Sequence, residues 1–229
     1  MADEQPLPRP PSRIQRIGHT ISAVIIHAPV LWPVLKGPMT RFFDDAAAGW
    51  DERNRAPSSD HLAPLGIALD RTAGPPPERI LDIGTGTGVA ALMLAREYPG
   101  ARVRGIDVSE QMIREARRKT GLDPEGRIHF RVSDAADLPW DDESFDLVAQ
   151  VNMPPFFSEI ARVLRPGGHV VIAHTLGPQT PFYAANDLLT RKFARHEIDV
   201  VAQGTHGQAT WFCARRAGEP PHDSAPVLD

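Results

Sequence analysis

Three carboxylates and a group of glycines stand at spacings that suit a nucleoside ligand. Residues 80–83 form a short apolar run that is typical of a buried strand, and Gly84, Gly86 and Gly88 follow it. Glycines here permit a tight turn and let a ligand lie against bare backbone, beside the unpaired N–H groups of the next helix. The segment is therefore predicted to form a strand, a glycine-rich turn and a helix that hold a nucleotide-like ligand.

The three carboxylates come at the ends of three predicted strands. Asp82 stands two residues before the first glycine, where a carboxylate would repel a pyrophosphate and attract a cationic amine. Asp107 ends the second strand and can accept from both ribose hydroxyls, while Asp134 follows the third and can accept from an adenine amino group. Each acid alone could be a helix N-cap. Together with the glycine turn, they predict a site for an adenosine that carries a charged amine.

The glycine spacing disfavours a dinucleotide. The dinucleotide fingerprint reads G-x-G-x-x-G, whereas here Val89 stands three residues after Gly86 and Gly88 comes one residue too early. A nicotinamide-dependent oxidoreductase therefore stays an alternative, which titration with fluorescent NADH would reveal.

From Arg79 onward, short β-rich runs alternate with helical segments, a pattern that predicts βαβ units, a parallel sheet and right-handed crossovers. The expected strands are 79–83, 102–106, 127–132, 145–150, 168–174, 197–202 and 209–215. The expected helices are 87–98, 109–119, 156–164 and 185–194. The two glycines in the connector 203–208 predict a hairpin, which would place the last strand antiparallel to its neighbours.

Outside this region, the chain divides into shorter segments. A proline-rich arm (1–13) is expected to be disordered, a helical extension (14–73) precedes the ligand-binding domain (74–216), and a loose tail (217–229) ends the chain. In the extension, Ser58 or Ser59 could cap a helix that runs through Leu69 and stops at residues 74–77.

The apolar stretch 21–35 is the most ambiguous part of the extension. It is interrupted by His27, Pro29 and Pro33 and falls short of the ~20 apolar residues that span a bilayer, so it predicts a broken helix packed on the domain. Docking at a membrane surface is the alternative. The apolar residues from Ile14 to Trp50 lack another partner in a one-domain chain, which suggests a lid over the ligand.

Composition excludes several classes of function. A formal net charge of −4 gives no basic surplus for binding a phosphate backbone, so nucleic acid is not an expected partner. The one cysteine, Cys213, can form no disulfide within the chain and leaves a cysteine-based zinc site without ligands. We therefore expect a cytoplasmic protein without a metal and without stable membrane insertion.

The ordered set of motifs resembles the class I S-adenosylmethionine-dependent methyltransferases. The set comprises the turn from Asp82 to Gly88, Asp107, the run 133–135, the strand start 145–148 and the Arg-Pro-Gly-Gly run within 162–168. Within that superfamily, the sequence is similar to the group that includes ubiquinone and menaquinone methyltransferases. The resemblance implies a Rossmann-like three-layer α/β sandwich, a seven-stranded, mostly parallel sheet with an antiparallel last strand, and S-adenosylmethionine as the methyl donor.

The resemblance also assigns roles to residues. Gly84, Thr85 and Gly86 would lie behind the methionine and ribose, and Asp107 would hold the ribose hydroxyls. The adenine would lie between Asp134 and Ala135, and Asp82 would approach the amine. The full set of expected cofactor contacts is Asp82, Gly84, Thr85, Gly86, Gly88, Asp107, Val108, Asp134, Ala135 and Asn152.

The acceptor side is less determined by the sequence. Methyl transfer from a sulfonium is an in-line displacement that depends on positioning, so a catalytic base is optional; His174 and Tyr183 are candidates, with a loop histidine bonded to backbone as the alternative. We expect O- or C-methylation of a small molecule. Residues 152–157 resemble the Asn-Pro-Pro-aromatic signature of enzymes that methylate nucleobase amines, but Met153 interrupts it. A non-catalytic binding protein of the same fold is the other alternative.

Overall fold

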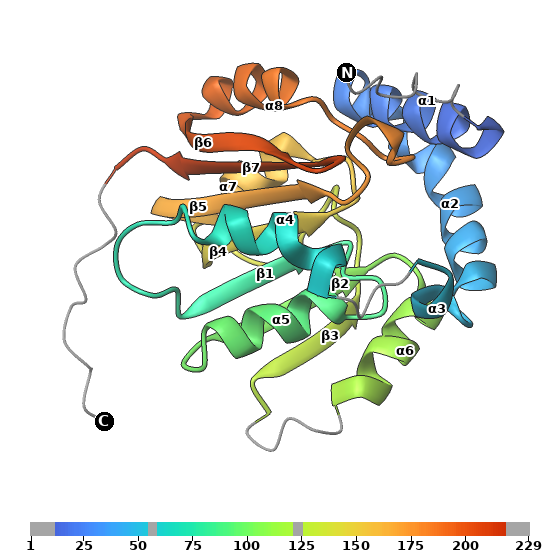
Figure 1. Ribbon diagram of the computed structural model, residues 1–229, viewed down its shortest axis with the longest axis horizontal. Helices are drawn as coiled ribbons and strands as arrows, with labels where there is room; N and C mark the ends of the chain where they lie inside the picture. The colour runs from blue at the N-terminus through green and yellow to red at the C-terminus, as the bar shows by residue number, and fades with distance from the viewer. Residues whose placement is uncertain (1–11, 55–58, 121–125, 219–229) are drawn as a thin grey trace, which may run out of the picture.

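The computed structural model describes residues 12–54, 59–120 and 126–218, and they form the three-layer α/β sandwich shown in Figure 1. Its seven-stranded sheet has the order β3-β2-β1-β4-β5-β7-β6. Neighbours from β3 to β5 pair in parallel, whereas β7 is antiparallel to both β5 and β6. The strands are β1 (Arg79–Ile83), β2 (Arg102–Asp107), β3 (Ile128–Val132), β4 (Phe145–Val151), β5 (Leu164–His174), β6 (Ile198–His206) and β7 (Ala209–Arg216). The predicted mostly parallel sheet with an antiparallel last strand is confirmed.

Helices cover both faces of this sheet, and each face has its own hydrophobic core. Helices α4 (Ser59–Leu69), α5 (Val89–Glu97) and α6 (Glu110–Lys119) pack on one face, around Leu65, Leu94 and Ile113. Helices α7 (Phe157–Val163) and α8 (Asn186–Phe193) pack on the other, around Ile160 and Phe193. The alternating β and α elements predicted from the sequence therefore lie in three layers.

Most predicted boundaries differ from the observed ones by one or two residues, and the two largest differences, of four residues each, have a physical reason. Strand β5 begins at Leu164 and not at 168, because Leu164 already pairs with Phe145 before a register shift in the ladder. Strand β6 continues to His206, which shortens the hairpin connector from 203–208 to residues 207–208. As the edge strand, β6 is largely exposed and carries polar residues, so hydrophobic alternation could not mark its end.

The N-terminal extension forms a bent pair of helices. Helix α1 (Arg13–His27) begins with Ser12, whose hydroxyl accepts from the Gln15 N–H at 3.2 Å while the Gln15 side chain accepts from the Ser12 N–H at 2.6 Å. The 3₁₀ turn η1 (Pro29–Leu31) interrupts the chain, and α2 (Trp32–Ala46) follows, then the short α3 (Trp50–Asn54). The helix is broken as predicted. The predicted disordered arm (1–13) was placed two residues too far, because Ser12 already caps α1 and Arg13 belongs to it. Residues 1–11 of that arm, residues 219–229 of the predicted tail (217–229) and the Ser58 cap lie outside the described residues.

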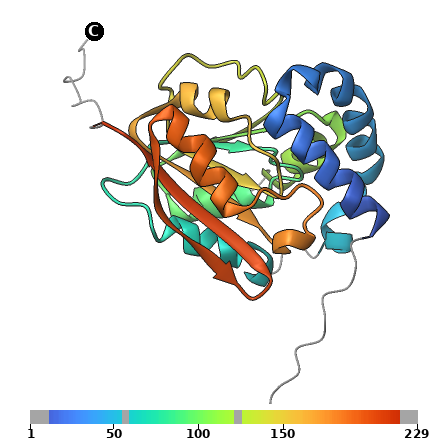
Figure 2. The ribbon, with the colours of Figure 1, turned by 90° about the horizontal axis from the view of Figure 1, so that it is seen from above.

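These N-terminal helices lie along the edge of the sheet at which the parallel strands end (Figure 1), and Figure 2 shows α1 beside α8 on the upper face. Among the described residues, no single helix is long and apolar enough to cross a membrane. The pair α1 and α2 reaches that length and composition only together, across a bend of 116°.

Candidate functional site

The glycine-rich turn between β1 and α5 forms the base of the site. Gly84, Gly86 and Gly88 all have left-handed backbones, with φ of 72°, 52° and 83°. A Cβ on Gly88 would lie 2.6 Å from the Phe130 ring, which explains the glycine there, whereas a Cβ on Gly86 would meet nothing within 4 Å. The turn is therefore packed from behind at Gly88 and open at Gly86, where a ligand can approach the backbone.

Asp82 lies at the bottom of this turn and has an unpartnered oxygen. Its side chain is 1% exposed, its Oδ2 accepts from the Thr85 hydroxyl at 2.6 Å, and its Oδ1 has no hydrogen-bond partner among the described residues. Burial raises the pKa of Asp82 to about 7. The hydrogen bond from Thr85 lowers this pKa, and the nearby Asp107 carboxylate raises it further. A buried, unpartnered carboxylate oxygen is rare and fits a cationic ligand group.

Asp107 ends β2 beside the turn, as predicted. Its Oδ2 accepts from the Gly86 N–H at 3.0 Å and its Oδ1 from the Ser109 N–H at 2.9 Å. Burial raises the pKa of Asp107 to about 6, and these backbone N–H groups act in the opposite direction. Each oxygen keeps a second lone pair, so the carboxylate can also accept from two ligand hydroxyls. The neighbouring Val108 packs against the core on the same side.

Asp134 and the buried Ala135 follow β3, also as predicted, but Asp134 contacts helix α2 as well. Its Oδ1 accepts from the Trp32 indole N–H at 2.8 Å, and its Oδ2 forms an ion pair with Lys36 Nζ at 2.8 Å. Trp32 is 5% exposed, so its ring lies inside the molecule, edge-on to Phe156. The N-terminal extension therefore closes over the acid that the sequence assigned to the adenine.

Two further acids of the extension contact the glycine turn and helix α6, and the sequence did not single them out. Asp44 Oδ1, at the end of α2, accepts from the Ser109 hydroxyl at 2.6 Å and from the Gln111 N–H at 3.2 Å. Asp51, in α3, accepts from the Thr87 hydroxyl and forms an ion pair with Lys119. Acids that follow aromatic residues, as in residues 42–51, were the available signal, but spacing alone does not show their partners.

The loop after β4 takes a form different from an open ligand clamp. Asn152 has a left-handed φ of 56°, and its side-chain amide donates to the Thr175 hydroxyl at 2.9 Å and accepts from the Thr175 N–H at 2.8 Å. Met153 lies directly over the glycine turn, where a Cβ on Gly84 would overlap its sulfur. Asn152 thus ties the ends of β4 and β5 together, and Met153 is the residue of this loop that faces the turn.

Neither candidate base is available as a strong proton acceptor. His174 is 1% exposed, accepts at Nε2 from the Ala184 N–H at 3.3 Å, and lies 3.5 Å from the Thr210 hydroxyl through Nδ1. Burial lowers the pKa of His174 to about 3. Tyr183 packs edge-on against it, and burial raises the pKa of its hydroxyl. The arrangement corresponds to the alternative of a histidine bonded to backbone.

Gln150 is a further unusual polar residue, which sequence reasoning missed because it lies inside an apolar strand. It is fully buried on β4, between Ile83 and Ile172 of the adjacent strands. Neither atom of its side-chain amide has a hydrogen-bond partner among the described residues. On α1, which packs on the same core through Ile25 and Ile26, the Ser22 hydroxyl is also buried and unpartnered.

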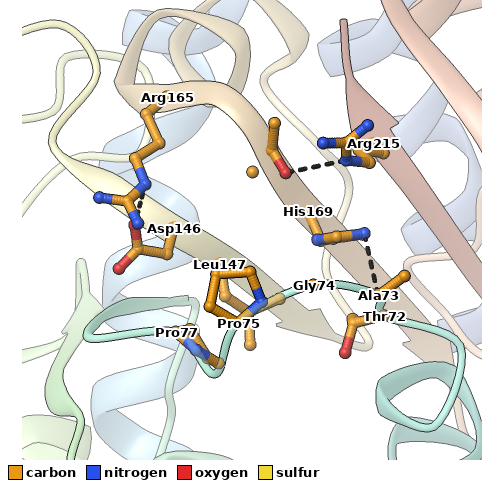
Figure 3. Close-up of a pocket in the computed structure, with 12 residues that line it drawn as sticks. Thr72, Ala73, Gly74, Pro75, Pro77, Asp146, Leu147, Arg165, His169 and Arg215 are labelled. Atoms are coloured by element: carbon orange, nitrogen blue, oxygen red, sulfur yellow. Dashed lines mark hydrogen bonds and ion pairs between the residues drawn. The ribbon is translucent and has the colours of Figure 1, made fainter. Parts of the chain in front are cut away.

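A hollow lies at the end of the sheet opposite to the glycine turn, near the starts of β4 and β5 (Figure 3). Its polar groups already have partners in the protein. Asp146 accepts from the backbone N–H groups of Glu78 and Arg79, both at 2.8 Å, and pairs with Arg165, while Arg215 donates to the Gly167 carbonyl at 3.1 Å. These contacts connect loops, and the hollow contains none of the predicted site residues.

Fold and site together describe an α/β protein whose parallel strands end at a candidate site for an adenosine-type ligand with a cationic group. Comparisons with known proteins agree with this description. A family model described as a methyltransferase domain matches residues 80–168. Demethylmenaquinone methyltransferase of Clavibacter sepedonicus is 35% identical over 175 residues, which cover 72% of this chain and 70% of that protein.

Other relatives match over shorter stretches. The O-methyltransferase cnsE of Penicillium expansum is 39% identical over 52% of this chain and 46% of its own length, and the chain spans about half the length of several other curated relatives. A solved structure of an S-adenosylmethionine-dependent methyltransferase from Aquifex aeolicus is similar with a TM-score of 0.59 and 19% identity, covering 70% of this chain and 95% of that one.

This chain belongs to the class I S-adenosylmethionine-dependent methyltransferases, in the group that includes the ubiquinone and menaquinone methyltransferases. Its cofactor is S-adenosylmethionine. Two features of the structure fit that molecule: the unpartnered oxygen of Asp82 matches a cationic amine, and the open space at Gly86 admits a ligand to the backbone.

Proposed function

We propose that the protein transfers the methyl group of S-adenosylmethionine to an oxygen or carbon atom of a small-molecule acceptor. The observation that carries this proposal is the unpartnered amide of Gln150, which lies buried one residue before the end of β4 at Val151. A buried amide that lacks partners costs about 1–3 kcal/mol, so a ligand that supplies them gains binding energy and orientation. The cover formed by α1 and α2 favours a small acceptor over a polymer.

On this proposal, the residues at the strand ends divide the cofactor between them. Asp82 holds the amine, Asp107 the ribose hydroxyls, and Asp134 with Ala135 the adenine, while the backbone of residues 84–86 lies behind the methionine. Their positions around one turn support this division, and the other expected contacts, at Gly88 and Val108, shape the turn and its wall. Asn152 contributes by fixing the loop that carries Met153.

The bound cofactor supplies an electrophilic methyl group on a sulfonium, and the chain has to align the acceptor with it and exclude water. On transfer, the acceptor atom would take the methyl group, the donor would leave as neutral S-adenosylhomocysteine with the C–S electron pair on its sulfur, and the acceptor's proton would pass to solvent. Because His174 is neutral and bonded on both sides, positioning is the contribution we assign to the protein.

The relatives support this class of acceptor. One is named a demethylmenaquinone methyltransferase, another a malonyl-[acyl-carrier protein] O-methyltransferase and a third a ubiquinone/menaquinone biosynthesis C-methyltransferase, so that the last two names state O- and C-methylation. We also place the protein in a reducing compartment such as the cytoplasm, because its single cysteine, Cys213, is a free buried thiol and the chain can form no internal disulfide.

The test measures release of S-adenosylhomocysteine with a panel of hydroxyquinones, phenols and carboxylic acids, using the wild type, Gln150→Leu and the matched control Gln208→Leu on the exposed hairpin turn. We expect Gln150→Leu to bind S-adenosylhomocysteine normally while kcat/KM for the acceptor falls by roughly 5- to 150-fold, the loss of one to two hydrogen bonds. An unchanged kcat/KM would remove Gln150 from the acceptor site. Cofactor binding without turnover on the whole panel would instead identify a non-catalytic binding protein.

A further inference from the structure

The junction between α1 and α2 exposes an apolar segment that the methyltransferase site does not use. Val30 is 82% exposed, Val34 74% and Leu31 48%. No charged residue stands between His27 and Lys36, and the two prolines at 29 and 33 are exposed as well. Isolated exposed aliphatic side chains are ordinary, but three of them within five residues, interrupted only by the buried Trp32, mark a candidate interaction surface.

Cations lie immediately beside this segment, on α8 and on the 3₁₀ turn η4 (Ala194–His196) that follows it. A hollow between the two elements is lined by His27, Leu188, Arg191, Lys192 and Arg195. Lys192 Nζ donates to the Ile26 carbonyl at 3.0 Å, which joins α8 to the last turn of α1, three to four residues before Val30. Figure 2 shows α1 and α8 beside each other on one face of the molecule.

The two arginines of this hollow are unengaged. Arg191 and Arg195 are exposed, and within the described part of the chain neither forms an ion pair with a carboxylate. The protein as a whole has a formal charge of −4, so these cations form a local positive area on an acidic molecule. A cluster of cations next to exposed aliphatic side chains is complementary to a surface that offers anionic groups and hydrocarbon together.

We propose that this face, formed by the α1–α2 junction and α8, docks on an anionic phospholipid bilayer. The headgroup phosphates would face Arg191, Lys192 and Arg195, and the side chains of Val30, Leu31 and Val34 would enter the boundary between headgroups and acyl chains. Trp32, between them in sequence, points inward to Asp134 and stays with the cofactor site. Docking therefore uses residues distinct from those that hold the cofactor.

The experiment is flotation of the full-length protein with vesicles of phosphatidylcholine alone and of an equal mixture of phosphatidylcholine and phosphatidylglycerol. We expect binding to the mixed vesicles only, and weaker binding at high salt. Each basic residue near such a surface contributes about 1 kcal/mol, so Arg191→Gln with Arg195→Gln is expected to weaken partitioning roughly 30-fold. Val30→Ser with Val34→Ser should weaken partitioning as well.

The matched control is Arg96→Gln with Arg102→Gln, which changes two exposed arginines on α5 and β2. Its partitioning to the mixed vesicles should stay within about twofold of that of the wild type.

Other outcomes would overturn the proposal. Absence of wild-type binding to the mixed vesicles, or an equal loss in the control pair, would exclude a lipid surface. Titration with inorganic phosphate that saturates at the hollow, without vesicle binding, would identify a site for a small anion. A concentration-dependent increase in mass by analytical ultracentrifugation that Val30→Ser with Val34→Ser removes would identify a second copy of the chain as the occupant. Unchanged melting temperatures of all variants establish that each change acts on the surface.

Discussion

Replacing Asp82 by asparagine should separate the energetic roles of this buried carboxylate. The pKa of Asp82 is raised from 3.8 to about 7 by burial, so between these values the folded protein holds a proton that the unfolded chain releases. The stability of the cofactor-free wild type therefore falls as pH rises from about 4 to 7. A pKa shift of about three units, at about 1.4 kcal/mol per unit, sets an upper limit of about 4 kcal/mol on this loss in the free energy of unfolding. Asp82→Asn should recover the lost stability at pH near 8.

The same substitution should also weaken cofactor binding. In the wild type, the affinity for the cofactor should rise with pH, whereas the stability of the cofactor-free protein falls with pH. An ammonium group pairs only with the ionised carboxylate, so the affinity of the wild type for S-adenosylhomocysteine should rise up to tenfold per pH unit and level off above about pH 7. Asp82→Asn should bind roughly 10- to 150-fold more weakly near pH 8, the loss of a charged hydrogen bond of about 1.5–3 kcal/mol. The affinity of Asp82→Asn should then show only a smaller change near pH 6, where Asp107 titrates.

Urea denaturation and calorimetric titration across this pH range measure the two effects, with Asp199→Asn on the exposed face of β6 as the control. Asp82→Asn is expected to be more stable without cofactor and weaker with it. A variant that is less stable than the wild type near pH 8, or one that keeps the full wild-type pH dependence of binding, would refute the assignment of Asp82 to the amine.

Three further changes test the supporting structure. Gly88→Ala forces a Cβ against the Phe130 ring at φ 83° and should lower the free energy of unfolding by roughly 2–4 kcal/mol in urea. Asp44→Ala removes the acceptor for the first turn of α6 and should lower it by about 0.5–2 kcal/mol, with a parallel loss of protection for the Gln111 amide in hydrogen exchange. His174→Asn should leave the pH profile of kcat unchanged between about 5 and 8, because burial keeps this imidazole neutral. A profile that shifts would restore His174 as a base.

The strand-turn-helix that carries the cofactor could be predicted because its signals are local. Apolar runs, glycines and a terminal acid follow one another within a few residues, and parallel strands bring their ends to a common edge. Asp82, Asp107 and Asp134 consequently lie where the sequence placed them.

The contacts of the N-terminal extension could not be predicted in the same way. Trp32, Asp44 and Asp51 each contact a residue between 36 and 102 positions away, and a helical segment carries no mark of the strand end against which it will pack. The role of Gln150 could not be predicted for a related reason. A polar residue in an apolar strand becomes informative only when the structure shows that its neighbours offer no hydrogen-bond partner. The extension's role as a lid remains a prediction.

The attachment of Trp32 and Lys36 to Asp134 has a consequence for the order of events in a catalytic cycle. If the adenine lies against Asp134, as we propose, α2 covers it, and a lid at this position predicts that the cofactor enters before α2 closes and leaves only after it opens. On the proposed function, the acceptor binds at Gln150 and therefore approaches from the side of α1. Steady-state kinetics should therefore be ordered, with S-adenosylhomocysteine released last and inhibiting competitively toward S-adenosylmethionine but not toward the acceptor.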